Sequence, residues 1–181
     1  MARVHTAGHS TRTADELLAL LAGAGVELLV DVRRFPASRR HPQFGREALA
    51  AALAAAGIEY RHEPDLGGRR APRPDSPHTA WRVAAFRGYA DHMETPEFAA
   101  ALARLEALAA ARRTAVLCAE ALPHRCHRRL IADALVARGH EVVHLLAPGR
   151  AEQHALHPEA RVLADGRLLY AAGGSAPLFP E

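Results

Sequence analysis

The run Val26-Glu-Leu-Leu-Val-Asp-Val32 decides the fold class, because it is short and almost continuously apolar. A run of this kind is typical of a strand that is covered on both faces, as in parallel sheets. The stretch Val4–Ala7 upstream is also predicted to be a short strand, and it leads into Gly8-His9-Ser10. Between the two, Thr13-Ala-Asp-Glu16 predicts a helix that begins with a capping box. The beginning of the chain therefore indicates a strand–helix–strand unit.

Strand-like and helix-like patterns keep alternating along the rest of the chain. Helices are predicted at residues 46–56 and 81–93, and from Thr95-Pro96 and Pro123 onward, because proline suits the first helical position. Strands are predicted at residues 58–62, 114–118 and 141–146, and a hairpin at 162–169. This alternation favours an α/β fold: a single compact domain over residues 1–170, with a mostly parallel sheet flanked by helices and a small C-terminal hairpin. Residues 171–181 are expected to form a flexible tail.

Composition favours a cytoplasmic protein with an anionic partner. The 181 residues suit one domain, and no apolar run approaches the ~20 residues of a membrane helix. The N-terminus also lacks the apolar segment of a secretory signal. All 23 basic residues are arginine, and although the formal charge is only +3, they gather in two predicted loops, residues 33–40 and 65–78. We therefore expect an anionic small molecule or a nucleic acid as partner, and no membrane.

Polar residues directly follow several of the predicted strands. In a parallel sheet such positions share one edge, and ligands bind there. An Asp-x-Arg pair at this edge either forms an internal ion pair or orients a substrate group, and arginine binds phosphate and carboxylate alike. We expect the following strand-end residues to form one cleft: His9, Ser10, Asp31, Arg33, Cys118 and Glu120.

The segment between residues 117 and 128 concentrates reactive side chains. Cys118 and Glu120 end a strand, whereas Cys126 falls in the predicted first turn of the next helix. The helix dipole, together with Arg125 and Arg128, favours a thiolate or a bound anion there. The alternative is a pair of half-buried structural cysteines, since free cysteine packs as a small apolar residue. The loop differs from that of cysteine-dependent phosphatases, because it lacks glycine and places one residue too many between cysteine and arginine.

A zinc site at this edge would need Cys118, Cys126, His127 and a fourth ligand such as His9. Among these four residues there is neither a Cys-x-x-Cys nor a His-x-x-x-His pair, and the 12 histidines supply many chance ligands. The predicted site residues therefore include no assigned metal ligand, metal binding stays open as an alternative, and the sequence identifies no cofactor. Tyr89 lies on one face of the predicted helix 81–93, where it contacts either the substrate or the core.

Eight blocks spread between Val4 and His144 resemble one known family when they are taken together. They are Thr6–Ser10, Asp31–Arg33 with Pro36 and Ser38, Leu66–Gly68, Phe86–Met93, Cys118–Glu120, Pro123, Cys126–Arg128 and Leu130–Asp133. The family is the domain of unknown function family 488 (DUF 488), from which Ala7 departs, since isoleucine or valine is usual there. The resemblance implies a compact α/β fold and brings no established reaction. Some members are labelled iron–sulfur assembly proteins, but two cysteines cannot supply four thiolates.

The leading hypothesis is an enzyme that acts on a phosphate-bearing or nucleotide-like substrate through Cys118 or Glu120, as a hydrolase or a transferase. Two alternatives remain: a nucleic-acid-binding accessory module, or a metal-binding or thiol-redox protein that uses Cys118 and Cys126. The predicted catalytic residues are Cys118, Glu120, His9, Asp31, Cys126 and His127. The predicted substrate-binding residues are Ser10, Arg33, Tyr89, Arg125 and Arg128.

Overall fold

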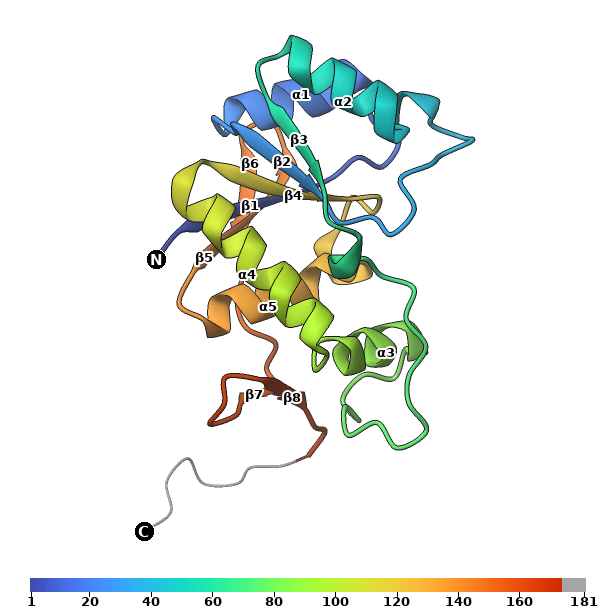
Figure 1. Cartoon of the computed structure of the whole chain (residues 1–181), viewed down its shortest axis with the longest axis vertical. Coiled ribbons are helices and arrows are strands. Elements are labelled where there is room, and N and C mark those ends of the chain that lie inside the picture. Colours follow the sequence, from blue (N-terminus) through green and yellow to red (C-terminus); the bar gives the residue numbers. More distant parts are fainter. Residues whose placement is uncertain (174–181) are drawn as a thin grey trace.

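The computed structural model describes residues 1–173, which form a six-stranded sheet with helices on both faces and a separate two-stranded hairpin (Figure 1). The strand order is β3-β2-β4-β1-β5-β6, and all neighbours are parallel except β6, which runs antiparallel to β5. The predicted α/β fold with a mostly parallel sheet is therefore confirmed. The strands are β1 (Arg3–Gly8), β2 (Leu28–Asp31), β3 (Glu59–His62), β4 (Thr114–Cys118), β5 (Glu141–Ala147) and β6 (Arg150–Gln153).

Strand β6 is the one strand of the sheet that the sequence did not predict. Its four residues are all exposed and show no apolar alternation. It forms because Gly149, with a φ of +72°, turns the chain back so that β6 can pair with the free edge of β5.

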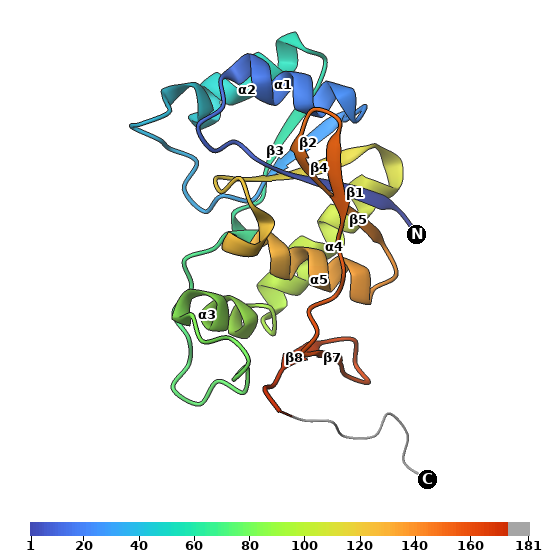
Figure 2. The same ribbon diagram turned by 180° about the vertical axis from the view of Figure 1, so that it is seen from behind.

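Four helices form two layers around the sheet, as Figures 1 and 2 show from opposite sides. Helices α1 (Ala14–Gly23) and α2 (Arg46–Ala55) cover one face, while α4 (Pro96–Ala111) and α5 (Arg128–Ala137) cover the other. Successive residues of a strand point to opposite faces. In β2, Leu28 and Val30 accordingly pack with α4 and α5, whereas Leu29 packs with α1 and α2.

The carboxyl ends of β1, β2 and β4 lie at one edge of the sheet. Asp31 is in register with Leu117, and Gly8 is in register with Cys118. The prediction that Asp31 and Cys118 share an edge is therefore confirmed. The alternation of strand residues nevertheless places Asp31 on the face of α1 and α2, while Cys118 belongs to the core beneath α4 and α5.

Local capping signals fix the starts of two helices as predicted. Thr13 accepts a hydrogen bond from Glu16 N at 3.1 Å, and Glu16 Oε2 accepts one from Thr13 N at 2.9 Å, which completes the capping box of α1. Thr95 accepts a hydrogen bond from Phe98 N and precedes Pro96, the first residue of α4. Both helices begin where side chains satisfy the first free N–H groups.

Two predicted helix starts were wrong. Helix α3 spans Ala84–His92 and not residues 81–93, because Trp81 is buried among aromatic rings in a turn before the helix. Pro123 opens only a short 3-10 turn, and α5 begins at Arg128. Cys126, between them, has an extended backbone and a buried side chain, which interrupts the helix that the sequence predicted.

The predicted C-terminal hairpin is present as β7 (Ala160–Val162) and β8 (Leu168–Tyr170). It is attached to α5 by a hydrogen bond from the Tyr170 hydroxyl to Asp133 at 2.8 Å. Most of the expected tail, residues 171–181, lies outside the described residues. Within residues 1–173, no helix has both the length and the apolar surface needed to cross a membrane.

Candidate functional site

A pocket of about 550 Å³ opens at the carboxyl edge of the sheet and brings together most of the predicted site residues. Its lining includes seven of them: His9, Arg33, Cys118, Glu120, Arg125, Cys126 and His127. Four predicted site residues are not part of the lining: Ser10, Asp31, Tyr89 and Arg128. The edge rule for parallel sheets therefore located the pocket, but it did not separate the lining residues from those behind them.

The floor of this pocket is formed by two buried cysteines and a half-buried histidine, Cys118, Cys126 and His127. His127 Nδ1 lies 3.7 Å from Cys118 Sγ and 3.8 Å from Cys126 Sγ. The other ring nitrogen, Nε2, donates a hydrogen bond to the Val32 carbonyl at 3.2 Å, which fixes the orientation of the ring. The Arg128 backbone N–H also points to Cys126 Sγ at 3.5 Å. Two sulfurs and one imidazole nitrogen thus face a common point.

The two thiols have different acidities. The hydrogen bond with Cys126, together with burial, raises the pKa of Cys118 well above its ordinary value. Burial also opposes ionisation of Cys126, but its hydrogen bonds with Cys118 and His127 and the charge of Arg128 lower its pKa well below the ordinary value. Cys126 is therefore the more acidic thiol, and the cause is its contacts with Cys118, His127 and Arg128, because it lies before α5 and not in the first helical turn that the sequence predicted.

Asp31 does not face the pocket, because its carboxylate lies behind Arg33 and is engaged in hydrogen bonds with Arg33 and Tyr60. Its oxygens accept hydrogen bonds from the Arg33 backbone N–H, from two nitrogens of the Arg33 guanidinium and from the Tyr60 hydroxyl, at 2.6 to 3.0 Å. Arg33 Nη1 is left to point at His9 Nε2, 3.4 Å away. His9 Nδ1 donates to the Ser10 carbonyl, and burial lowers the pKa of His9. Asp31 therefore positions Arg33, and Arg33 and His9 face the pocket.

Arg128 is fully buried and does not face the pocket either. Its guanidinium donates hydrogen bonds to the carbonyls of Glu120 and Ala121, the latter at 2.7 Å. These bonds hold the loop that follows β4, in which the exposed Glu120 lines the pocket. The observed contacts give Arg128 a positioning role in this loop.

Gly8 allows the same loop to approach β1. A Cβ atom at Gly8 would lie 1.8 Å from the Glu120 carbonyl oxygen, which is far inside contact distance. We expect Gly8→Ala to lower the free energy of unfolding by about 2–3 kcal/mol, because backbone atoms must move to relieve the overlap. Chemical denaturation measures this. Gly23→Ala in α1 is the matched control, since nothing lies within 4 Å of its added methyl group, and it should not destabilise the protein. Equal behaviour of the two variants would contradict the close packing at Gly8.

Arginines form the rim of the pocket. Five of them are exposed: Arg34, Arg39, Arg40, Arg69 and Arg125. Glu120 supplies the one carboxylate in the lining. The sequence pointed to this rim through its arginine-rich segments 33–40 and 65–78, although Arg34, Arg39, Arg40 and Arg69 were not among the predicted substrate-binding residues. The pocket is therefore strongly positive around a sulfur-rich floor.

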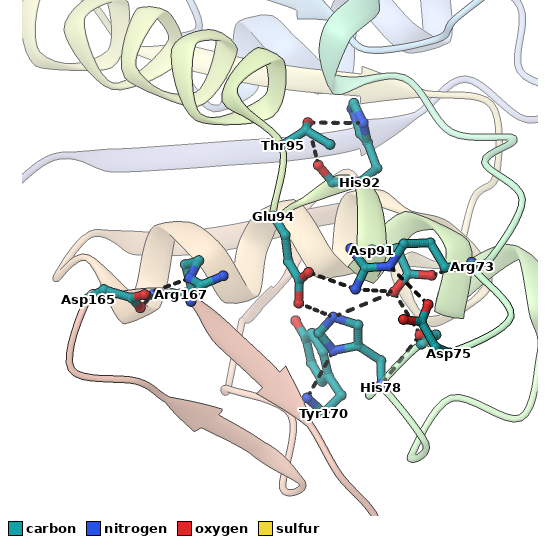
Figure 3. A network of polar contacts seen from close by, with 11 residues as sticks. Arg73, Asp75, His78, Asp91, His92, Glu94, Thr95, Asp165, Arg167 and Tyr170 are labelled. Carbon is teal, nitrogen blue, oxygen red and sulfur yellow. Dashed lines mark hydrogen bonds and ion pairs between the residues drawn. The ribbon is translucent and has the colours of Figure 1, made fainter.

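The predicted second basic segment, residues 65–78, is mostly engaged in internal contacts. Arg70 donates a hydrogen bond to the Gly67 carbonyl. Arg73 pairs with Glu94 at 2.9 Å and with Asp91 at 3.6 Å, as Figure 3 shows. These contacts fasten the loop to the end of α3. Arg69 is the arginine of this segment that lines the pocket.

Tyr89 supports the site from behind. It is buried, and its hydroxyl donates to the Leu66 carbonyl at 2.7 Å. Its ring lies 5.0 Å from that of His127, and Gly68 packs so closely that an added Cβ would lie 2.8 Å from His127 Nδ1. Tyr89 and Gly68 thus hold the histidine in place. Sequence reasoning missed the role of Gly68, although the Gly67-Gly68 pair was a signal of close packing.

One family model matches the chain, that of the Domain of unknown function DUF488, and it covers residues 13–135. The match includes both cysteines, Glu120 and His127, whereas β1 with His9 precedes it. No curated protein and no solved structure matches the chain.

Proposed function

The chain belongs to the DUF488 family, and from its site we propose that it is a hydrolase that acts on a phosphate-bearing, nucleotide-sized substrate. One observation carries the proposal: an arginine rim, a glutamate and a Cys–Cys–His floor meet in a single pocket at the carboxyl edge of the sheet. The volume of about 550 Å³ lies within the usual range for small-molecule sites.

The arginine rim supports an anionic substrate. Guanidinium groups bind phosphate oxygens in a bidentate manner, and several of them around one mouth concentrate an anion before it binds. Arg33 is held rigidly by Asp31 and so loses little conformational freedom when it binds a ligand. Phe35 and Phe86 line the same pocket and provide apolar surface for the organic part of the substrate.

Glu120 is the proposed general base. Glu120 is exposed and lines the pocket, and none of the ion pairs among residues 1–173 involves it. It removes a proton from water, the water oxygen attacks the electrophilic atom of the substrate, and the leaving group departs with the bonding electrons and takes the proton from Glu120. Cys118 is less suited to attack the substrate, because its thiol is buried and holds its proton.

Phosphate should stabilise the protein more than chloride does at matched ionic strength. A ligand present at a hundredfold excess over Kd adds about 2.7 kcal/mol to the free energy of unfolding. Arg125→Ala should weaken phosphate binding by roughly tenfold or more, since a hydrogen bond to a charged group contributes about 1.5–3 kcal/mol. Arg113→Ala, at the start of β4 on the opposite edge, is the control and should change nothing. The melting temperature measures both effects.

Equal shifts with phosphate and chloride would contradict the proposed anion site. A panel of nucleoside mono-, di- and triphosphates, assayed for released phosphate and released base, then identifies the substrate. The binding-module alternative gives a different pattern: no turnover, and affinity for nucleic acid that falls with salt by about 0.7–0.9 log units per log unit for each phosphate contact.

A further inference from the structure

We infer that Cys118, Cys126 and His127 form a binding site for a thiophilic divalent cation, with Zn²⁺ as the best fit, at the floor of the pocket. The binding of the cation stands on the geometry of these three residues alone. The catalytic role of the cation rests on the proposed function, to which it adds a role for the floor of the pocket.

The spacing of the donor atoms fits such a cation. The two sulfurs and the imidazole nitrogen all lie within 4.8 Å of one another, and Nδ1 is 3.7 and 3.8 Å from the sulfurs. In a tetrahedral zinc site, with Zn–S near 2.3 Å and Zn–N near 2.0–2.1 Å, a sulfur and a nitrogen ligand are about 3.6 Å apart. Both sulfur–nitrogen distances are therefore already close to those of such a site, whereas the sulfur–sulfur distance, which is at most 4.8 Å, would become about 3.8 Å on binding.

The groups behind the three donors orient them as they do in metal sites. Because His127 Nε2 donates its proton to the Val32 carbonyl, the lone pair of a neutral ring lies on Nδ1, toward the sulfurs. The Arg128 backbone N–H donates to Cys126 Sγ, an interaction that favours a thiolate. Gly68 and Tyr89 pack on the ring of His127 and limit its movement.

Charge and burial also favour a cation at this point. Two thiolates would neutralise a divalent cation, so that the buried site as a whole carries no net charge. Zn²⁺ prefers sulfur and imidazole donors, in contrast to Mg²⁺ and Ca²⁺, which prefer oxygen. A neutral site also leaves the arginine rim free to attract an anionic substrate.

The site has three protein ligands, which is typical of catalytic zinc. His9, the fourth ligand that the sequence suggested, is engaged with Ser10 and Arg33. A fourth position facing the pocket would hold water, whose pKa a bound zinc ion lowers to about 7. A bound cation would therefore make a water at this position more acidic, and Glu120, which lines the same pocket, would accept its proton.

To test this, the full chain is reduced, treated with a chelator to remove metal and titrated with Co²⁺. Binding is monitored by visible and near-ultraviolet absorption. We expect one equivalent to bind, with a sulfur-to-cobalt charge-transfer band and the visible bands of tetrahedral cobalt, and Zn²⁺ to displace it. Cys118→Ser, Cys126→Ser and His127→Gln should each weaken binding by about 100-fold or more. His41→Gln, a pocket-lining histidine outside the cluster, is the matched control and should bind normally.

A second readout uses the native chain and needs no variant. Bound Zn²⁺ should protect both cysteines of the native chain from an alkylating reagent until a chelator is added. The inference is overturned if the native chain binds no stoichiometric Co²⁺, or if cobalt bound by the folded serine variants keeps the native affinity and spectrum. If the chain binds no cobalt but is still stabilised by phosphate and still turns over substrate, the metal site alone is refuted. If the chain binds cobalt but shows neither stabilisation by phosphate nor turnover, the proposed function alone is refuted.

Discussion

Asp31→Asn should lower the free energy of unfolding by about 3–5 kcal/mol, because it leaves the charge of Arg33 buried without a partner. Asp31 is fully buried and Arg33 is 7% exposed. The carboxylate accepts four hydrogen bonds, three of them from Arg33, so its neutralisation weakens all of them. Chemical denaturation measures the loss. The same variant should reduce the stabilisation by phosphate, since Arg33 would no longer be held toward the pocket.

The chain contains a matched control for this experiment. Asp165 and Arg167 repeat the Asp-x-Arg spacing, and Asp165 likewise accepts hydrogen bonds from the backbone N–H and the Nε of Arg167. This pair is about half exposed, so water replaces the lost contacts and Asp165→Asn should change stability little. If the two variants lost the same stability, burial of the Asp31–Arg33 pair would not be what makes it important.

The fold could be predicted largely because its signals are local. Short strand-like segments predicted β1 to β5, most clearly the apolar runs of β2 and β4, and the capping residues Thr13 and Thr95 predicted the starts of α1 and α4. Strand β6 has no such signal, because its pairing depends on the free edge of β5. The start of α5 could not be predicted either. Proline is favoured at the first position of a helix, but the extended, buried Cys126 ends the turn that Pro123 begins.

The location of the pocket could be predicted, but the side chains that line it could not. The parallel topology indicated the correct edge, but sequence does not tell which side chains turn into the pocket. Arg125 and Arg128 are three residues apart, yet the first is exposed at the rim and the second is buried against the loop carbonyls. Asp31 was predicted as catalytic and instead lies behind Arg33. These distinctions depend on tertiary packing, and in particular on the close approach of the loop after β4 to Gly8.

Glu120→Gln should lower kcat by about 10²–10⁴-fold on the substrate that the panel identifies, because glutamine cannot accept the proton from water. The variant keeps the size and the exposed position of the side chain, so stability and phosphate binding should remain as in the native chain. Arg125→Ala should do the reverse, raising KM more than it lowers kcat, since the arginine binds the phosphate without taking part in proton transfer. Steady-state kinetics separates the two effects.

Glu152→Gln is the matched control, because Glu152 is an exposed carboxylate on β6 outside the pocket. It should leave both constants unchanged. If Glu120→Gln kept the native kcat while Cys126→Ser abolished turnover in the metal-free enzyme, the nucleophile would be the thiolate of Cys126, and water activation by Glu120 would be wrong. A loss of turnover with Glu120→Gln, accompanied by unchanged binding of phosphate and of Co²⁺, would instead assign the proton transfer to Glu120. The arginine rim and the Cys–Cys–His floor would then each have a separate role in the same pocket.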